Sequence, residues 1–388
     1  MKTKSLTQVC NITTGKLDAN AGIPNGKYPF FTCAPDPLRI DTFAFDDDVV
    51  LLAGNNAQGN FHIQRFKGKF NAYQRTYVIT ARDGYDIDYV KYSLELSLQH
   101  LKRIAQGSQT KFLTMQILDS FRVVDIPYDA QRHLIGSIRE VDSKISLNTC
   151  ICAELETMAK TLYDYWFTQF DFPDENGKPY RSSGGDMVWN EQLKREIPMG
   201  WSVDNLYSIA EPINGLACQK YRPKESEAEL PVVKIKEMHE GITADTEKVS
   251  ASIPEKHKIF DGDILFSWSA TLEVMYWFGG DAGLNQHIFK VVPINGFSKE
   301  YVYHQFSAYV INFVKMAEAR KTTMGHITTD HLEQSRIALP PSEIIQAFSK
   351  IVAPIHEKIG HCQKENRELT KLRDWLLPML MNGQAAVE

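Results

Sequence analysis

The chain contains two long stretches in which apolar residues recur at alternating three- and four-residue steps. At the start of the C-terminal stretch, 341–383, the double proline 340–341 is followed by Ser342, whose hydroxyl is suited to cap a helix. Its apolar positions are Ile345, Phe348, Val352, Ile355, Ile359, Cys362, Leu369 and Leu376, interrupted by Asn366 and Arg373. A stripe sustained over several heptads predicts a coiled-coil helix.

The stretch 128–169 shows the same stripe about two hundred residues earlier. Its positions are Leu134, Ile138, Val141, Ile145, Asn148, Cys152, Leu155, Ala159, Leu162 and Trp166. Because neither stripe can face water, we expect the two helices to pair antiparallel. In the register that matches every position of the two stripes, Asn148 faces Asn366 and Cys152 faces Cys362. A buried Asn pair specifies the alignment of two helices. The alternative, in which each helix packs only on its own globular half, remains open.

Shorter patterns are duplicated in the same order. Phe-Asp-Asp-Asp-Val-Val-Leu-Leu begins at Phe45, and Phe-Asp-Gly-Asp-Ile-Leu-Phe-Ser begins at Phe260. Runs rich in β-branched and aromatic residues predict strands at 45–52, 75–80, 264–267 and 287–292. We therefore expect an α+β fold with two strand-rich domains, 1–127 and 201–340, in inverted repeat. The two antiparallel coiled-coil helices, 128–169 and 341–383, separate them, and 170–200 is the linker.

Composition narrows the class of protein. The 388 residues are 43% hydrophobic and 23% charged, and the net charge is −5. The chain is not strongly basic, so its overall charge does not indicate nucleic-acid binding. No apolar run is long enough to span a membrane, and no export signal is recognisable. The six cysteines form no Cys-x-x-Cys pair, so we expect reduced thiols in a cytoplasmic protein and no metal site.

Motifs for catalysis are missing from the sequence. There is no G-x-x-x-x-G-K-[ST] phosphate loop, no H-E-x-x-H zinc motif and no G-x-S-x-G nucleophile elbow. The double proline at 340–341 lacks the flanking residues of the adenine-methyltransferase tetrapeptide. We therefore expect a protein that is not an enzyme and has no catalytic residues.

Polar, aromatic and basic residues instead occupy loops at matching places of both repeats. Asn, Gln, Arg and Lys side chains read base edges, whereas Ser, Thr and Lys hold phosphates. The candidate DNA-binding residues are Asn55, Asn56, Gln58, Lys69, Tyr73, Arg75, Gln109, Thr110, Lys111, Ser267, Trp268, Ser269, Gln286, His287, Arg320, Lys321, Thr322, Thr323 and His326. Taken singly, such segments are more often ordinary solvated loops, and their recurrence at matching places favours DNA.

Several segments resemble the specificity subunits of type I restriction-modification systems. They are 14–20 and 28–33 near the start, then 170–173, 176–180 and 197–201 at the central joint. The resemblance covers nearly the whole chain. It implies two target-recognition domains that each read half of an interrupted double-stranded DNA sequence, with the helix pair setting the gap.

The resemblance also implies partners. Two methyltransferase subunits and two restriction or translocase subunits would share the complex, and S-adenosylmethionine, ATP and magnesium would belong to those subunits rather than to this chain. It places 106–111 and 320–326 where family members approach DNA.

Two other functions remain open on sequence alone. One is a scaffold whose two strand-rich domains bind protein or carbohydrate and whose helices serve only for assembly. The other is a self-contained modifying enzyme of an unfamiliar type. Selection of a split DNA motif would favour the specificity subunit over both.

Overall fold

The computed structural model describes residues 2–57, 59–107, 110–269, 271–319 and 329–381. The chain divides into two compact units. Unit 1 comprises Met1–Lys144 with Leu369–Glu388, and unit 2 comprises Ile145–Glu368. The long helices α4 (Tyr128–Tyr163) and α8 (Ser342–Met381) each contribute to both units, and a π-helical turn, Asp164–Thr168, continues α4.

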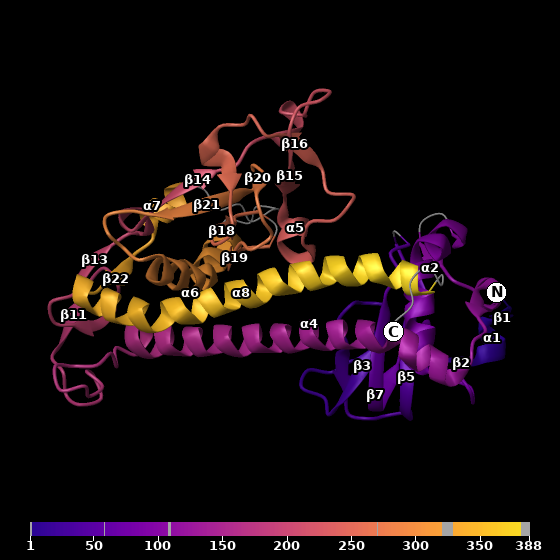
Figure 1. The fold of residues 1–388 in the computed structure, drawn as a ribbon. Coiled ribbons are helices and arrows are strands. Elements are labelled where there is room, and N and C mark those ends of the chain that lie inside the picture. Colours follow the sequence, from indigo (N-terminus) through magenta and orange to yellow (C-terminus); the bar gives the residue numbers. More distant parts are fainter. Residues whose placement is uncertain (1, 58, 108–109, 270, 320–328, 382–388) are drawn as a thin grey trace. The chain divides into compact units, whose positions relative to one another are not determined.

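Unit 1 is built on a six-stranded sheet of order β2-β8-β5-β7-β3-β4 (Figure 1). Its strands are β2 (Cys10–Thr14), β3 (Tyr28–Phe31), β4 (Leu38–Ile40), β5 (Phe45–Ala53), β7 (Ile63–Ala72) and β8 (Thr76–Ala81). All neighbours are antiparallel except β3 and β7. The predicted strands at 45–52 and 75–80 therefore lie within a residue of the observed β5 and β8.

Short elements complete unit 1. They are the strand pairs β1 (Thr3–Ser5) with β10 (Arg122–Val124) and β6 (Asn55–Asn56) with β9 (Lys111–Phe112), the 3-10 turn Ala19–Ala21, and the helices α1 (Leu6–Val9), α2 (Ile87–Ile104) and α3 (Met115–Ser120). Helix α2 was not expected from the sequence, and Asp86 caps it by accepting from the amides of Asp88 and Tyr89.

The core of unit 1 includes the end of α8. Leu377, Leu380 and Met381 are buried in the same cluster as Val50 of β5 and Ile138 of α4. Burial of apolar side chains is the main favourable term in folding, so the C-terminal turns of α8 help to stabilise the N-terminal domain.

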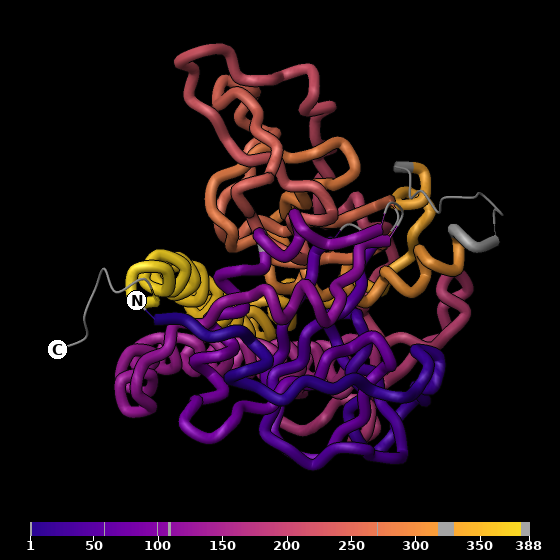
Figure 2. The backbone as a smooth tube through the Cα atoms, turned by 90° about the vertical axis from the view of Figure 1, so that its right-hand side faces the viewer, coloured from indigo at the N-terminus to yellow at the C-terminus, as the bar shows by residue number. Residues whose placement is uncertain are grey.

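Unit 2 contains two four-stranded sheets. One has the order β14-β21-β18-β19 and the other β16-β15-β20-β17. The strands are β14 (Ala210–Asn214), β15 (Glu229–Val233), β16 (Lys248–Ser250), β17 (Lys258–Ile259), β18 (Ile264–Ser267), β19 (Glu273–Tyr276), β20 (Ala282–Leu284) and β21 (Ile288–Pro293). Figure 2 shows the salmon-coloured chain around β15 and β16 rising from the rest of this unit, and separate small clusters form its core. The predicted strand at 264–267 matches β18, and the one at 287–292 is shifted by a residue.

The remaining elements of unit 2 connect these sheets to the long helices. They are the pair β13 (Ser202–Asp204) with β22 (Ile337–Leu339), the helices α5 (Ile235–Glu240), α6 (Lys299–Ala319) and α7 (Thr329–Gln334), and 3-10 turns at Leu206–Ser208, Cys218–Lys220 and Glu255–His257. Helix α6 was not expected from the sequence, because its aromatic and β-branched residues are also common in strands.

The segment 170–200, expected as a linker, is folded. It forms a hairpin of β11 (Met187–Asn190) and β12 (Arg195–Pro198). Phe170, Phe172 and Ile197 are buried in the main core of unit 2. The segment is therefore not only a connection between two domains. Its aromatic residues are part of the core that also contains the end of α4.

The end of α4 is part of that core. Tyr163, Trp166 and Phe167 are buried together with Phe348 of α8, and the ring centroids of Trp166 and Phe348 are 5.8 Å apart. In each unit, therefore, the closing turns of one long helix pack into the core. Within the described residues, no helix has the length and apolar character needed to cross a bilayer.

Candidate nucleic-acid interface

Three of the polar segments predicted in the first repeat meet at Gly54 of unit 1. The Gly54 amide donates to the Arg75 carbonyl at 2.9 Å, and the Leu113 amide donates to the Gly54 carbonyl at 2.8 Å. A Cβ atom at Gly54 would lie 2.2 Å from the Arg75 oxygen, so only glycine fits. Gly54 thus brings together the start of β8, the loop after β5 and the segment before α3.

A short ribbon extends this junction. Asn55 lies opposite Phe112 and Asn56 opposite Lys111. Lys102, which the sequence analysis missed, reaches in from α2 and donates to Asn60 Oδ1 at 2.6 Å. Lys102 was overlooked because it lies in the last turn of α2, a helix that was not expected from the sequence. Asn55, Asn56, Thr110 and Lys111 therefore share one surface with Lys102.

Lys69 does not belong to this surface. It lies opposite Asp46 near the start of β5, whereas Asn55 follows the end of that strand. Its ammonium is 4.7 Å from the centre of the Phe43 ring, a cation–π contact. Strand register, which the sequence did not reveal, separates Lys69 from the other basic candidates.

The candidates of unit 2 gather where β18 ends and β21 begins. Ser267 pairs with Ile288, and the Trp268 amide donates to the His287 carbonyl at 3.4 Å. The indole of Trp268 lies 5.6 Å from the His287 ring and 5.9 Å from the Phe289 ring. Gln286 Nε2 is 3.3 Å from His287 Nε2.

The two candidate serines lie inside this loop rather than on its surface. Ser267 is 1% exposed, and its hydroxyl donates to the Thr271 carbonyl at 2.6 Å. Ser269 is also buried. Their burial favours a role in bracing the loop over contact with a base. Gln58, Gln109, Arg320, Lys321, Thr322, Thr323 and His326 lie outside the described residues.

The four-residue turn Tyr73–Thr76 of unit 1 is held by a set of main-chain bonds. The Thr76 amide donates to Tyr73 at 2.9 Å, and the Gln74 amide donates to the Leu17 carbonyl at 2.9 Å. The Gly15 amide donates to Thr76 at 3.4 Å. A Cβ atom at Gly15 would lie within 2.6 Å of the carbonyl oxygens of both residues 72 and 73, so the chains approach as closely as glycine allows.

Unit 2 repeats this set around the turn Asn285–Ile288. The Ile288 amide donates to Asn285 at 3.0 Å, the Gln286 amide to Leu216 at 2.8 Å, and the Gly215 amide to Ile288 at 3.1 Å. A Cβ atom at Gly215 would lie within 2.6 Å of the oxygens of residues 284 and 285. Tyr73, Gln74 and Arg75 thus occupy the same places as Asn285, Gln286 and His287.

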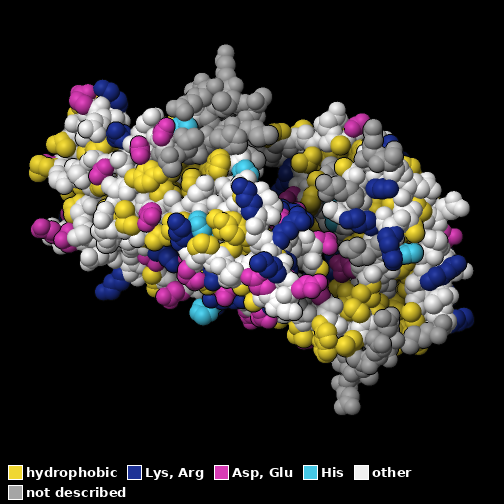
Figure 3. Space-filling view, turned by 90° about the horizontal axis from the view of Figure 1, so that it is seen from above, with side chains coloured by type: hydrophobic (Ala, Val, Ile, Leu, Met, Phe, Trp, Pro, Cys, Tyr) yellow, Lys and Arg dark blue, Asp and Glu magenta, His cyan; other side chains and the backbone are white. Residues whose placement is uncertain are grey.

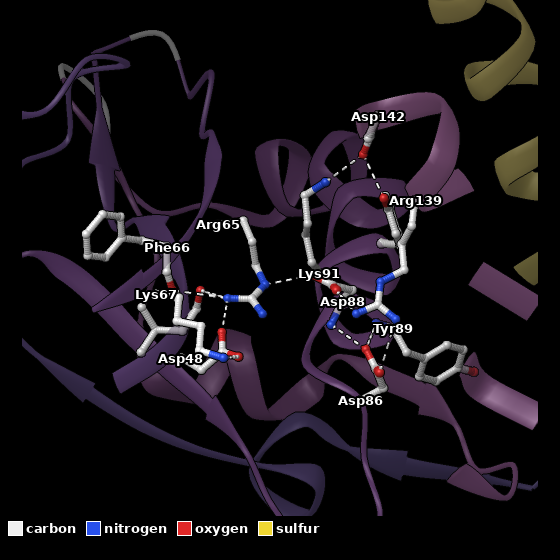
Figure 4. Close-up of polar contacts among 12 residues, drawn as sticks. Asp48, Arg65, Phe66, Lys67, Asp86, Asp88, Tyr89, Lys91, Arg139 and Asp142 are labelled. Atoms are coloured by element: carbon white, nitrogen blue, oxygen red, sulfur yellow. Dashed lines mark hydrogen bonds and ion pairs between the residues drawn. The ribbon is translucent and has the colours of Figure 1, made fainter. Parts of the chain in front are cut away.

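An ion-pair network fastens the sheet of unit 1 to its helices (Figure 4). Arg65 of β7 bonds Asp48 of β5 and Asp88 of α2, and Arg139 of α4 contacts Asp88 through its other oxygen. The guanidinium of Arg65 lies within a largely shielded setting, where charge-assisted bonds are strongest. This network orients the sheet, and with it the turn at 73–76.

Asp142 of α4 is a second node of the network. It accepts from Tyr92 at 2.7 Å, Lys91 at 3.1 Å and Arg373 at 3.2 Å. Burial raises the pKa of this carboxyl, but the bond from Tyr92 and the charge of Lys91, with further bonds from Lys91 and Arg373, outweigh burial and leave the pKa below its usual value. A depressed carboxyl pKa stabilises the fold above the unfolded-state pKa of about 4 and ceases to do so as the pH falls through the folded value.

Replacing Asp142 with Asn should therefore lower the unfolding free energy of unit 1 at pH 7. The difference from wild type should shrink as the pH falls from about 4, the unfolded-state pKa, through the lower pKa of the folded carboxyl, where that carboxyl gains its proton. Urea unfolding at several pH values measures this. Asp374→Asn is the matched control, because Asp374 also pairs with Arg373 but its side chain is 61% exposed. An equal effect of both changes would contradict the assignment.

The two long helices contact one another within unit 2, where Figure 1 shows them side by side. Asn148 is 1% exposed, and its Nδ2 donates to Asn366 Oδ1 at 2.9 Å and to Glu365 Oε2 at 2.7 Å. Asn366 Nδ2 donates in turn to the Ile145 carbonyl at 3.3 Å. These amides are the two polar interruptions that the sequence register aligned.

The next layer of the seam is apolar. Cys152 and Cys362 are buried in one cluster with Ile359, and Leu155 packs against it. Burial, followed by the nearby Cys362, raises the pKa of the Cys152 thiol to about 11. All six cysteines are free thiols. Thiols of this kind are inert at neutral pH, so the pair fills space between the helices.

On one face of the protein, basic side chains do not gather into a broad stripe. On the face shown in Figure 3, Lys and Arg side chains are interspersed with Asp and Glu. Within the described ranges, no group of three or more His, Cys, Asp or Glu side chains is arranged to hold a metal ion. Arg75, Lys102 and Lys111 are therefore candidates for local rather than extended contact with a polyanion.

The relation of this chain to known proteins follows from a family model. The model described as the type I restriction modification DNA specificity domain matches residues 1–157 and 198–371. The chain belongs to this family. Each matched segment contains one of the duplicated turns and part of one long helix. The family model therefore matches both repeats of the chain.

Relatives agree with this assignment. The chain is 26% identical over 329 residues to the type I restriction enzyme MjaIX specificity subunit of Methanocaldococcus jannaschii, which covers 80% of this chain and 72% of that protein. It is 25% identical over 340 residues to the HindI specificity subunit of Haemophilus influenzae, covering 74% of each. A local match to the EcoDI specificity subunit of Escherichia coli is 56% identical over 78 residues, but spans only 20% of this chain and 17% of that protein.

A solved structure shares the fold. The type I restriction-modification S subunit from M. genitalium superposes with a TM-score of 0.58 over 98% of this chain and 95% of that chain, at 14% identity. The prediction of a specificity subunit, rather than an enzyme, is confirmed by the family model and by the named relatives.

Proposed function

We propose that this chain reads a bipartite double-stranded DNA target, one half with each unit, and positions partner subunits on it. The observation that carries the proposal is the duplicated turn, which places three residues in the same backbone frame in both units. Two equivalent frames suit a target with two halves, and the side chains at these frames and in their loops include amide and guanidinium groups that read base edges.

The long helices would act as the spacer between the halves. In unit 2 their contact includes a hydrogen-bonded amide pair, of which Asn148 is buried, and such pairs favour one alignment over others. A fixed alignment would fix the number of unread base pairs between the half-sites. Their expected coiled-coil arrangement along the full length belongs to this proposal.

The partners of the proposed complex are two methyltransferase subunits and two restriction or translocase subunits. These would bind S-adenosylmethionine, ATP and magnesium, and this chain would bind none of them. The methyltransferase would flip and modify a base of the bound target, which requires it to be held in register on the DNA. Such a complex would work in the cytoplasm, where the chromosome is accessible.

Lys111 is expected to contact a phosphate, since it stands beside the base-reading candidates Asn55 and Asn56. Lys111→Ala should weaken binding to specific and non-specific duplexes alike, and should lower the slope of log affinity against log salt by about one. Fluorescence anisotropy of the assembled methyltransferase complex between low and moderate salt measures both.

Arg132→Ala supplies the control, because Arg132 is an exposed cation of α4 in the same unit. An unchanged salt slope for Lys111→Ala, or an equal loss for the control, would remove the phosphate assignment. If the wild-type complex shows no preference among duplexes in competition, the scaffold function takes the place of the DNA-reading one.

A further inference from the structure

The duplicated turns share one side chain and differ in its neighbours. The second position is glutamine in both, Gln74 in unit 1 and Gln286 in unit 2. The first position differs, and in unit 2 it faces inward, since Asn285 is 7% exposed and its Oδ1 accepts from the His287 amide at 3.3 Å. In unit 2, then, the second and third positions are the ones left to meet a ligand.

The common glutamine has the donor and acceptor that adenine requires. A carboxamide donates one N–H to adenine N7 and accepts from the adenine N6 amino group, and no other base offers this pair in the major groove. Gln74 is exposed, and its side chain has no hydrogen bond with a described residue. Its side chain is therefore available for such a contact.

The side chain of Gln286 is oriented by a hydrogen bond and can make the same contact with adenine. Its Nε2 donates to His287 Nε2 at 3.3 Å, and the His287 ring is in turn packed on Trp268. One N–H of the carboxamide is used in this way. The second N–H and the oxygen have no hydrogen bond with any residue that the structure describes, and these are the two groups that an adenine edge takes.

The third position distinguishes the two halves. Arg75 is exposed, its carbonyl is fixed by Gly54, and its guanidinium forms no ion pair with a described residue. A free guanidinium bonds O6 and N7 of guanine with two parallel bonds. His287 cannot act in this way because its ring supports Gln286 and lies against Trp268.

We propose that Gln74 and Gln286 each read an adenine, at the equivalent position of the two half-sites, and that Arg75 reads a guanine in the first half-site only. The equivalence comes from the main-chain bonds, which set both turns in one frame, and the difference comes from the third side chain. This inference rests on the proposed DNA-reading function and names the bases that the two sites select.

The test begins with the wild-type methyltransferase complex and a library of duplexes in which each position of the target is varied. The expected target has an adenine at the matching position of both halves and a guanine in one of them. Gln74→Ala should reduce discrimination against other bases at one adenine by roughly 10-fold or more, and Gln286→Ala should do so at the adenine of the other half. Arg75→Ala should relax the choice of guanine alone.

A base analogue removes dependence on variant folding. Replacing the selected adenine by 7-deazaadenine deletes the N7 acceptor, so wild-type binding should weaken by roughly 5-fold or more, while Gln74→Ala should lose nothing further at the first half-site. Gln116→Ala is the matched control, since Gln116 is an exposed glutamine on α3 in the same unit.

The outcomes separate the two levels of the account. If the wild-type complex selects no split sequence, the proposed function fails. If it selects one, yet Gln74→Ala and Gln286→Ala keep full discrimination at every position, the function stands and the assignment of bases is overturned. Equal sensitivity of wild type and Gln74→Ala to 7-deazaadenine would also overturn it.

Discussion

Lengthening both long helices by four residues is expected to widen the gap in the DNA target while both half-site sequences stay unchanged. The insertions go between Cys152 and Leu155 in α4 and between Ile359 and Cys362 in α8, positions that face one another in the seam. Four residues add about 6 Å and turn the helix by about 400°, which leaves the seam within roughly 40° of its original face. The gap should grow by about one or two base pairs, because a duplex rises about 3.4 Å per base pair.

The same insertion in α4 alone is the matched comparison. It would leave Asn148 and Asn366 aligned but would shift every pair beyond Cys152 by a full turn, so Tyr163 and Trp166 could not reach their places in the core of unit 2. We expect this variant to lose assembly or most of its stability. Selection from a library of duplexes measures the length of the gap, and gel filtration measures assembly of the complex. An assembled double-insertion complex that keeps the original gap would show that the helices do not set it.

Leu377→Ala is expected to destabilise unit 1 by about 2–5 kcal/mol, although residue 377 lies at the far end of the sequence from that domain. Leu377 is 6% exposed, and it lies in one buried cluster with Val50 and Ile79 of the sheet. Truncation removes the buried methyl groups and leaves a cavity between helix and sheet. The strands that carry the turn at 73–76 should lose protection, so DNA reading by the first unit should weaken too.

Leu372→Ala on the same helix is the control. Leu372 is 43% exposed, so the same truncation should change the unfolding free energy by less than about 0.5 kcal/mol. Native-state hydrogen exchange of the Val50 and Ile79 amides measures unit 1 separately from unit 2. Equal protection in the two variants would mean that the end of α8 does not belong to the core of the first domain.

The repeated plan and the helix stripes could be predicted because both leave a periodic record in the sequence. Strands at 45–52 and 264–267 were evident from their β-branched residues, and the seam aligned Asn148 with Asn366 because a polar residue in an apolar stripe is conspicuous. Helix α6 was missed for the opposite reason. Its Tyr, Phe and Val residues favour strands locally, and only packing against the sheet decides for a helix.

The candidate site was predicted as a set of loops but not as a geometry. The junction at Gly54 depends on main-chain bonds between segments some twenty to sixty residues apart, and nothing local in the sequence specifies them. For the same reason Lys69 was grouped with Arg75, and Ser267 was expected at the surface. The equivalence of Gln74 and Gln286 could have been suspected from the short repeats in the sequence. The intervening loops differ in length, however, and hide the correspondence.

The most direct test of the account is to sequence modified bases genome-wide in cells with and without this gene, its partner genes being present in both. We predict that one split motif, with two short specified halves around a gap of constant length, is modified only when the gene is present. Loss of modification should extend to both halves together, since one chain reads them. A motif that is continuous, or a modification pattern that is the same in both cells, would contradict it.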